Sequence, residues 1–334
     1  MKVAVFSTKP YEEAALLAFN KDFDHELVFF KEPLTKETVS LAAGYPAVCT
    51  FVNDSLDAPA LKLLAEGGTK LIALRCAGHD SVDLKAASAN NITVMRVPAY
   101  SPYAIAEFTL GILLAQNRKI PNAWQRVQTG DFHLNGLVGN DFHGKTVGIL
   151  GTGRIGAAVA RIFKLGFQCD VLANDLYPSA EMESIGVRYV DRETIFTKAD
   201  VISLHCPLTK ETKGLINAKT LDMMKPNVYL VNTSRGGLVD TAALADALES
   251  GRIRGAALDV YEGERALFFR KLSLDQIDDP LFKRLIKLPN FLLTGHQAFL
   301  TQEAIDAIAT ITLTNISNFS IGKLDKNVAV EKYS

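Results

Sequence analysis

The chain has 334 residues, of which 48% are hydrophobic and 22% are charged, and its formal net charge is -1. This length is comfortable for two domains, and the composition is typical of globular proteins, which excludes a disordered chain. Without a basic excess there is no electrostatic support for nucleic-acid binding, and no apolar run reaches the roughly 20 residues of a membrane helix.

The N-terminus and the cysteines are typical of a protein from the reducing cytoplasm. The opening segment, "MKVAVFSTKP", is apolar only as far as Ser7 and Thr8, so it predicts a buried strand and is too short for a signal-peptide core. The cysteines are Cys49, Cys76, Cys169 and Cys206. Because they are far apart and form no C-x-x-C pair, we expect neither a metal site nor a disulfide framework.

Short apolar runs alternate with helical patterns in the N-terminal part of the chain. The predicted strands are "VAVFS" (3–7), "AVCTF" (47–51), "LIALR" (71–75) and "ITVMR" (92–96). Between them, segments such as "PALKLLAEGG" (59–68) carry apolar residues at helical spacing and end on glycine, as helices do. This alternation predicts a parallel sheet covered by helices on both faces.

The pattern breaks at residues 96–119, where Pro98 and Pro102 end a strand and a long helix with an apolar face begins after Pro102. The alternation then restarts. The predicted strands are "TVGIL" (146–150), "CDVLAND" (169–175), "VISLHC" (201–206), "VYLVNT" (228–233), "GAALDV" (255–260) and "NFLLTG" (290–295). We therefore predict two doubly wound α/β units, and we expect a final helix, about 301–321, to return to the first one.

A glycine turn and a carboxylate predict a dinucleotide site. Gly151, Gly153 and Gly156 have the G-x-G-x-x-G spacing, which is weak evidence alone, but here they follow an apolar strand and open an alanine-rich helix. Without a side chain at Gly153, the backbone can approach a pyrophosphate held at the helix N-terminus. Asp175 ends the next predicted strand, where a carboxylate would bind the adenosine ribose and repel a 2′-phosphate. NAD is therefore favoured over NADP.

Three polar residues come just after predicted strands of the second unit: Arg235, Glu264 and His296. Each has an ordinary structural explanation in isolation, as a solvated charge, a surface glutamate or a lone histidine beside apolar residues. Reduction of a keto acid, however, needs an anchor for the carboxylate, a proton donor and a group that keeps the donor charged. Because ligands bind outside the carboxyl ends of parallel strands, we expect these residues to converge. Arg235 could grip the carboxylate with two parallel bonds, and His296 becomes the candidate acid.

Six ordered segments resemble the D-isomer-specific 2-hydroxyacid dehydrogenases, and within that family the fermentative D-lactate dehydrogenases of bacteria. They are "HGKTVGILGTGRIG" (143–156), "SLHCPLTKETKGLIN" (203–217), "MKPNVYLVNTSRGGLVD" (224–240), "ALDVYEGE" (257–264), "DDPLFKRL" (278–285) and "GHQAFLT" (295–301). The resemblance implies an NAD-binding Rossmann domain (101–299) inserted into a flavodoxin-like substrate domain (1–100 and 300–334), with hinges near Tyr100 and Phe299. We also expect a homodimer or homotetramer with a small 2-keto or 2-hydroxy acid as substrate.

The resemblance also implies roles for individual residues. Arg235 binds substrate, His296 is the acid/base, and Glu264 pairs with His296 and favours its charged form. Asp175 holds the adenosine ribose, Asp259 lies by the nicotinamide carboxamide, and the "HCP" segment lies under the adenine side. The implied cofactor-binding residues are Gly151, Gly153, Arg154, Ile155, Gly156, Asp175, His205, Cys206, Pro207, Thr233, Ser234 and Asp259.

For the substrate, the resemblance points to a loop of the first domain. "RCAGHDSVDL" (75–84) matches the loop whose backbone N–H groups, around Gly78 and His79, receive the substrate carboxylate. The other implied substrate-binding residues are Tyr100, Arg235, His296 and Phe299. Two departures leave substrate preference and the subunit contact open: the run His79-Asp80-Ser81 replaces an aromatic-Asn-Asn type of run, and Tyr103 and Phe108 replace smaller or polar residues.

The function predicted from these features is NAD-dependent, reversible reduction of pyruvate to D-lactate. Residues 266–282 and the "GHQAFLT" segment favour the lactate branch. One alternative is a member of the same family that acts on a larger 2-keto acid, such as phenylpyruvate or hydroxypyruvate. An alternative from another class is an NAD-sensing protein of the corepressor type, which the bacterial-type sequence disfavours.

Overall fold

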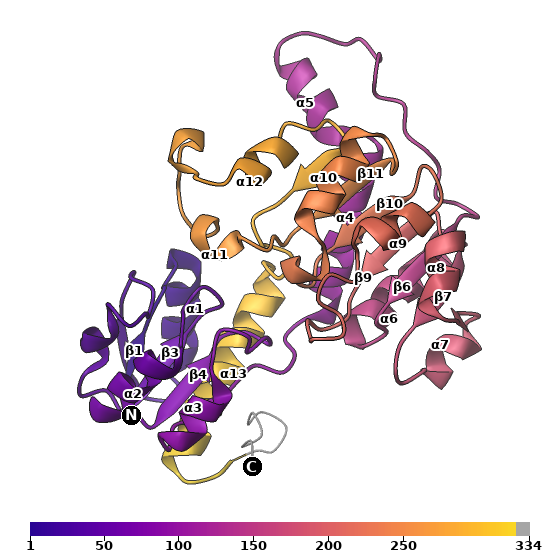
Figure 1. The fold of residues 1–334 in the computed structure, drawn as a ribbon. Coiled ribbons are helices and arrows are strands. Elements are labelled where there is room, and N and C mark those ends of the chain that lie inside the picture. Colours follow the sequence, from indigo (N-terminus) through magenta and orange to yellow (C-terminus); the bar gives the residue numbers. More distant parts are fainter. Residues whose placement is uncertain (325–334) are drawn as a thin grey trace. The chain divides into compact units, whose positions relative to one another are not determined.

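The computed structural model describes residues 1–324, and they form two compact units (Figure 1). Unit 1 contains residues 1–101 and the segment that begins at Leu300, and unit 2 is Pro102–Phe299. Each unit has one sheet in which every pairing between strands is parallel. The predicted class, two α/β units with doubly wound parallel sheets, is confirmed.

The sheet of unit 1 has five strands in the order β2-β1-β3-β4-β5, which is the flavodoxin-like order. Their bounds are β1 (Lys2–Val5), β2 (Glu26–Phe29), β3 (Ala47–Thr50), β4 (Leu71–Leu74) and β5 (Thr93–Met95). The sequence did not predict β2. As an edge strand without a fully buried residue, β2 lacks the continuous apolar run that marks β3 and β4.

Within residues 1–324, four α-helices accompany this sheet: α1 (Pro10–Asn20), α2 (Ala58–Glu66), α3 (Leu84–Ala89) and α13 (Gln302–Ser320). Asp57 caps α2 by accepting a hydrogen bond from the Ala60 N–H. Helix α13 packs against α1 and β4, and its Leu313 and Ile316 are buried in one of the two apolar clusters of unit 1. Helix α13 therefore covers part of one face of the N-terminal sheet.

The sheet of unit 2 has seven strands in the order β12-β11-β10-β9-β6-β7-β8. Their bounds are β6 (Thr146–Leu150), β7 (Asp170–Asn174), β8 (Arg188–Tyr189), β9 (Val201–Leu204), β10 (Tyr229–Asn232), β11 (Gly255–Leu258) and β12 (Phe291–Leu293). Counted from β6, this is the Rossmann order with one further strand, and the order reverses between β6 and β9. The edge strand β8 was not predicted, since two residues carry no detectable pattern.

The helices of unit 2 connect these strands, apart from α4 and α5, which precede the sheet in the chain. They are α4 (Pro102–Asn117), α5 (Ile120–Gln128), α6 (Arg154–Arg161), α7 (Ala180–Ser184), α8 (Arg192–Lys198), α9 (Ala218–Met223), α10 (Thr241–Glu249), α11 (Glu264–Leu267) and α12 (Pro280–Leu285). Among residues 1–324, no helix combines the length and the apolar character that a membrane span requires.

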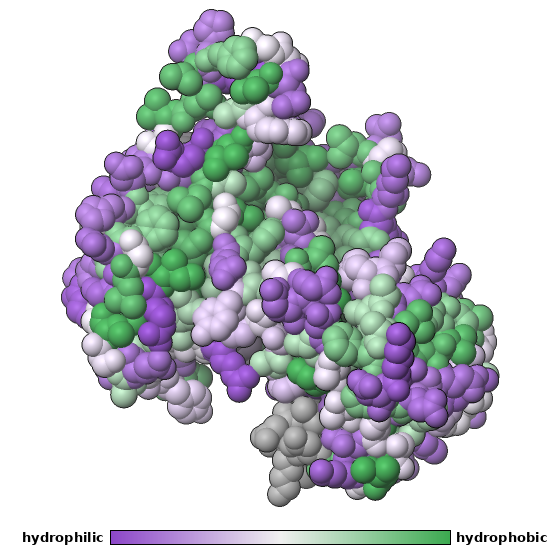
Figure 2. Space-filling view, turned by 180° about the vertical axis from the view of Figure 1, so that it is seen from behind, coloured by the Kyte–Doolittle hydropathy of each residue, from purple (hydrophilic) through white to green (hydrophobic). Residues whose placement is uncertain are grey.

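Helix α5 differs from the other long helices because none of its residues is buried. Ile120, Trp124 and Val127 of α5 are exposed, and so are Phe132 and Leu134 of the segment that follows. Figure 1 shows α5 projecting from its unit, and in Figure 2 hydrophobic residues are present on this same projecting part of unit 2. We call these five residues the α5 surface.

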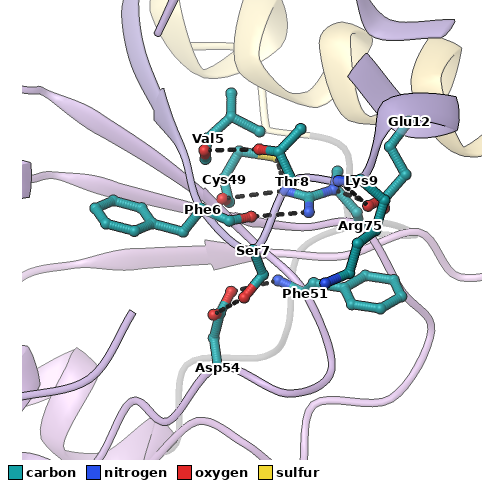
Figure 3. A network of polar contacts seen from close by, with 10 residues as sticks. All are labelled: Val5, Phe6, Ser7, Thr8, Lys9, Glu12, Cys49, Phe51, Asp54 and Arg75. Atoms are coloured by element: carbon teal, nitrogen blue, oxygen red, sulfur yellow. Dashed lines mark hydrogen bonds and ion pairs between the residues drawn. The ribbon is translucent and has the colours of Figure 1, made fainter. Parts of the chain in front are cut away.

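A buried arginine joins the carboxyl ends of the strands in unit 1 (Figure 3). Arg75, which is 1% exposed, donates from Nε to the Glu12 carboxylate at 3.1 Å. Its Nη2 donates to the Phe6 carbonyl at 2.9 Å and its Nη1 to the Cys49 carbonyl at 3.2 Å. Removing one partner from such a pair leaves an uncompensated buried charge. Asp54 is also buried there and accepts from the Ser7 hydroxyl at 2.6 Å.

This polar cluster lies where a flavodoxin-like sheet reverses its strand order, between β1 and β3, and where such folds commonly bind ligands. In unit 1 the position is filled by the side chains of the protein itself. The cluster fixes the start of the loop that follows β4, since Arg75 is the first residue after that strand.

Candidate active site

The three predicted catalytic residues follow three neighbouring strands of unit 2. Arg235 comes after β10, Glu264 after β11 and His296 after β12, and these strands lie side by side in the order β12-β11-β10. Because all three strands are parallel, their carboxyl ends meet at one edge of the sheet. The sequence motifs are therefore neighbours in space.

His296 and Glu264 are in direct contact. The Nδ1 atom of His296 lies 2.9 Å from Oε1 of Glu264, and the two side chains are 17% and 24% exposed. The second carboxylate oxygen of Glu264 accepts a hydrogen bond from the Tyr261 N–H at 3.0 Å. Both carboxylate oxygens of Glu264 are thus oriented by hydrogen bonds, and Nδ1 of the imidazole is bonded to one of them. Among residues 1–324, no group bonds to the other ring nitrogen, Nε2.

The backbone of His296 is in the left-handed region, with φ 56°. The histidine N–H donates to the Asp259 carbonyl at 2.8 Å. The Asp259 carboxylate, which is 0% exposed, accepts from the N–H groups of Gln297 at 2.9 Å and Ala298 at 2.8 Å and from the Thr294 hydroxyl. Burial raises the pKa of Asp259, although these hydrogen bonds oppose the shift. The loop that carries His296 is therefore held by one buried aspartate.

Tyr261, whose N–H binds Glu264, is itself held by a second hydrogen bond. The Tyr261 hydroxyl donates to Oδ2 of Asp279 at 2.7 Å, and Oδ1 of Asp279 caps α12 by accepting from the Phe282 N–H at 2.9 Å. Burial, and then the hydrogen bond to Asp279, raise the pKa of Tyr261, so its hydroxyl stays protonated and donates. The sequence indicated no role for Tyr261 or Asp279. The signal was present in the segment "DDPLF", whose Asp-Pro pair is a helix start.

The Arg235 loop packs closely on the segment that leads to Glu264. A Cβ atom at Gly236 would lie 2.2 Å from the Tyr261 carbonyl carbon, so only glycine allows this approach. Asn232 fixes the loop by donating to the Arg235 carbonyl at 2.8 Å, and the arginine Nη1 donates to the Ser234 carbonyl at 2.8 Å. The guanidinium is thereby oriented at the carboxyl end of β10.

The glycine turn after β6 has the geometry that the predicted dinucleotide site requires. Gly151 has φ +96°, and a Cβ there would lie 2.7 Å from the His205 and Cys206 backbones. A Cβ at Gly156 would lie 1.9 Å from the Gly151 carbonyl oxygen, whereas one at Gly153 would meet nothing within 4 Å. The space above Gly153 is therefore open. Since Gly153 has no side chain to cap α6, the first N–H groups of that helix are left for an anion.

Asp175 follows β7 directly. Burial raises the pKa of this carboxyl, but hydrogen bonds from the N–H groups of Tyr177 and Thr152 outweigh burial and hold the pKa below its ordinary value. Asp175 is therefore ionised at neutral pH. Its charge stands at the carboxyl end of the strand next to β6, where the predicted ribose contact requires it.

The remaining predicted cofactor residues lie along the same edge of the sheet. Burial of the His205 ring lowers its pKa to about 3, so it is neutral, and its Nε2 lies 2.7 Å from the Ser203 hydroxyl. The Ser234 hydroxyl donates to the Cys206 carbonyl at 2.8 Å and so joins the ends of β9 and β10. The other residues of this set at the same edge are Arg154, Ile155, Pro207 and Thr233.

The predicted substrate residues belong to both units. Gly78 and His79 are in the loop after β4, and Tyr100 is near the end of the first segment of unit 1. Arg235, His296 and Phe299 belong to unit 2. In the part of the chain that the structure describes, no three His, Cys, Asp or Glu side chains are grouped so that they could hold a metal ion.

Residues 110–298 match the family described as D-isomer specific 2-hydroxyacid dehydrogenase, NAD binding domain. The chain is 54% identical to 2-hydroxyacid dehydrogenase homolog 1 of Schizosaccharomyces pombe, with 99% of this chain and 100% of the relative covered. It is 48% identical to D-lactate dehydrogenase of Escherichia coli, with 99% and 100% covered. The apo-structure of D-lactate dehydrogenase from Escherichia coli superposes with a TM-score of 0.88 at 47% identity, covering 98% of this chain and 99% of that one.

The chain belongs to the D-isomer-specific 2-hydroxyacid dehydrogenase family, as its motifs predicted. Unit 2 carries the family's NAD-binding domain, and NAD is the cofactor. The residues present fit this cofactor, because the open space at Gly153, the uncapped start of α6 and the ionised Asp175 match a pyrophosphate and a ribose.

The charge of Asp175 should decide which dinucleotide is used. We expect the wild type to prefer NADH to NADPH in kcat/KM, and Asp175→Ser to narrow that preference by about tenfold or more, since it removes a repulsion of about 1.4 kcal/mol or more. Steady-state kinetics with both cofactors measure the ratio. Equal use of both by the wild type would contradict the assignment, and Asp170→Ser, at the start of the strand that Asp175 follows, is the matched control.

Proposed function

We propose that this protein is an NAD-dependent D-lactate dehydrogenase that reversibly reduces pyruvate. The contact between His296 and Glu264, 2.9 Å long and placed at the edge of the NAD-binding sheet, carries the proposal. The full-length similarity to a relative named D-lactate dehydrogenase supports the choice of substrate.

In this reaction the bound cofactor supplies a hydride to the carbonyl carbon of the substrate. His296 donates a proton to the carbonyl oxygen, and Nε2 is the nitrogen that does so, because Nδ1 is bonded to Glu264. The ionised Glu264 carboxylate stabilises the imidazolium that this step requires. In the opposite direction, the neutral imidazole accepts the proton from the hydroxyl of D-lactate.

Arg235 binds the substrate carboxylate through its planar guanidinium, which lysine cannot reproduce. We also assign the N–H groups of Gly78 and His79 to the substrate carboxylate, and Tyr100 and Phe299 to contact with the methyl group of pyruvate. We assign unit 1 as the substrate domain and unit 2 as the domain that binds NAD, a division at Ser101 and Phe299 that follows the compact units.

A panel of 2-keto acids tests the proposal. With NADH, pyruvate should have the highest kcat/KM of the short acids, and the product should be D-lactate. A clear preference for phenylpyruvate or hydroxypyruvate would place the chain elsewhere in its family. Production of L-lactate would contradict the proposal, and tight NADH binding without turnover of any acid in the panel would indicate an NAD sensor.

Variants of the His296 and Glu264 pair test the mechanism. Positioned acid catalysis contributes about 10² to 10⁴ in rate, so His296→Gln should lose that much of kcat while it still binds NADH. Glu264→Gln keeps the shape but removes the charge that stabilises the imidazolium. Its rate profile for pyruvate reduction should therefore shift to lower pH, with substantial activity kept in acid.

The controls for this pair use the same assays. Glu262→Gln removes an equal charge from the same segment and should leave the profile unchanged. A His296→Gln variant with most of its kcat, or a Glu264→Gln profile that did not move, would mean that the pair is structural.

We also propose that the chain forms a homo-oligomer in the cytoplasm. The α5 surface supports this, because apolar side chains gathered on a projecting segment are typical of protein interfaces. None of the four cysteines, which all lie within residues 1–324, forms a disulfide, and this fits a reducing compartment. Sedimentation should give a dimer or a tetramer, and Trp124→Asp should shift the particle toward the monomer. A monomeric wild type would contradict the proposal.

A further inference from the structure

Two arginines follow neighbouring strands of unit 1, and their surroundings differ in charge. Arg75 follows β4 and pairs with Glu12 at 3.1 Å, so its charge is balanced within the protein. Arg96 follows β5, which is paired with β4. No carboxylate in residues 1–324 forms an ion pair with Arg96. An unbalanced positive charge therefore stands at the carboxyl edge of this sheet.

The Arg96 guanidinium binds the backbone of the loop that follows β4. Its Nη1 donates to the Ala77 carbonyl oxygen at 2.7 Å, a length typical of charge-assisted hydrogen bonds. The Ala77 C=O and the Gly78 N–H belong to one planar trans peptide, so they point in opposite directions. The Gly78 N–H therefore points away from Ala77 O and from the arginine on it, and no group in the described part of the chain accepts a hydrogen bond from it.

The neighbouring peptides of this loop are fixed in the same manner. The Val97 N–H donates to the Cys76 carbonyl at 3.1 Å, and the Cys76 thiol donates to the Gly78 carbonyl at 3.1 Å. Arg96 is itself tied to α13, because Asn315 donates to its carbonyl at 3.0 Å. Three successive carbonyls thus have donors within unit 1, and the orientation of the N–H groups on the same peptides is set.

We propose that Arg96 sets the affinity for the substrate carboxylate as a positioning residue that acts through the Ala77–Gly78 peptide. A cation on the carbonyl oxygen polarises the peptide and makes its N–H a stronger donor. The same unbalanced charge attracts an anion at the loop. The inference rests on the proposed function, in which the Gly78 and His79 N–H groups bind that carboxylate.

Arg96→Met removes the charge and the donor while it keeps an unbranched side chain. We expect the KM for pyruvate to rise about tenfold or more, together with the Kd of oxamate, the amide analogue of pyruvate, for the NADH complex. The Kd of NADH should not change, because the glycine turn lies in unit 2. Arg96→Lys, which keeps the charge and a donor, should recover part of the affinity.

A matched control separates this role from a loss of charge or of folding. Lys85→Met removes one positive charge from α3, an exposed position of the same unit, and should leave the KM for pyruvate and the Kd of oxamate unchanged. Thermal melting measures whether a variant is partly unfolded. Partial unfolding would lower kcat per mole of chain but would leave the KM for pyruvate unchanged.

Different results would overturn the role of Arg96 and the proposed D-lactate dehydrogenase activity. Wild-type oxamate affinity in Arg96→Met, or an equal rise in Lys85→Met, would overturn the inference while the proposed function stood. A wild type that neither reduces pyruvate nor binds oxamate would overturn the proposed function.

Discussion

The candidate active site depends on one buried carboxylate, that of Asp259. It accepts hydrogen bonds from Thr294, Gln297 and Ala298, and its backbone carbonyl accepts from the His296 N–H. A left-handed residue other than glycine costs roughly 1–3 kcal/mol, and hydrogen bonds to a charged group contribute about 1.5–3 kcal/mol each. The aspartate therefore offsets the strain at His296, and the imidazole is held against Glu264.

The parallel sheets explain why distant motifs meet. In unit 2 every loop that carries a predicted residue leaves the sheet at its carboxyl edge. Because β10, β11 and β12 are neighbours in the strand order, the loops that follow them begin side by side. Glycines then decide how closely these loops approach. Gly156 lets the first turn of α6 pack on the Gly151 carbonyl, and Gly236 lets the Arg235 loop pack on the segment before Glu264. Backbone contact at these two points fixes the shape of the cofactor turn and the distance between the Arg235 loop and the segment that leads to Glu264.

The central strands and the three residues of the candidate site could be predicted from the sequence, because each is marked by a local pattern of apolar residues. Central strands are continuous apolar runs, and Arg235, Glu264 and His296 each follow one of them. The edge strands β2 and β8 could not be predicted in this way, since they are short and incompletely buried. Contacts between residues in different loops could not be predicted from the sequence either. The bond from Tyr261 to Asp279 joins residues in separate loops, and no local pattern announces it.

Buried charge was the other feature that the sequence did not reveal. Arg75 ends an apolar run and resembles a surface residue after a strand, yet it is fully enclosed and paired with Glu12, which lies far away in the chain. The two residues meet because the strand order of unit 1 brings α1, which contains Glu12, close to the end of β4, which Arg75 follows. Arg96, after the next strand, has no such partner, and this contrast appears only in three dimensions.

The pH dependence of the wild-type enzyme in both directions tests most directly whether His296 and Glu264 form the acid/base pair. One ionisation should govern both rates, since the imidazolium is the acid for reduction and the imidazole is the base for oxidation. The kcat/KM for pyruvate should therefore fall as pH rises, and that for D-lactate should rise. Two profiles that changed in the same direction would contradict this account.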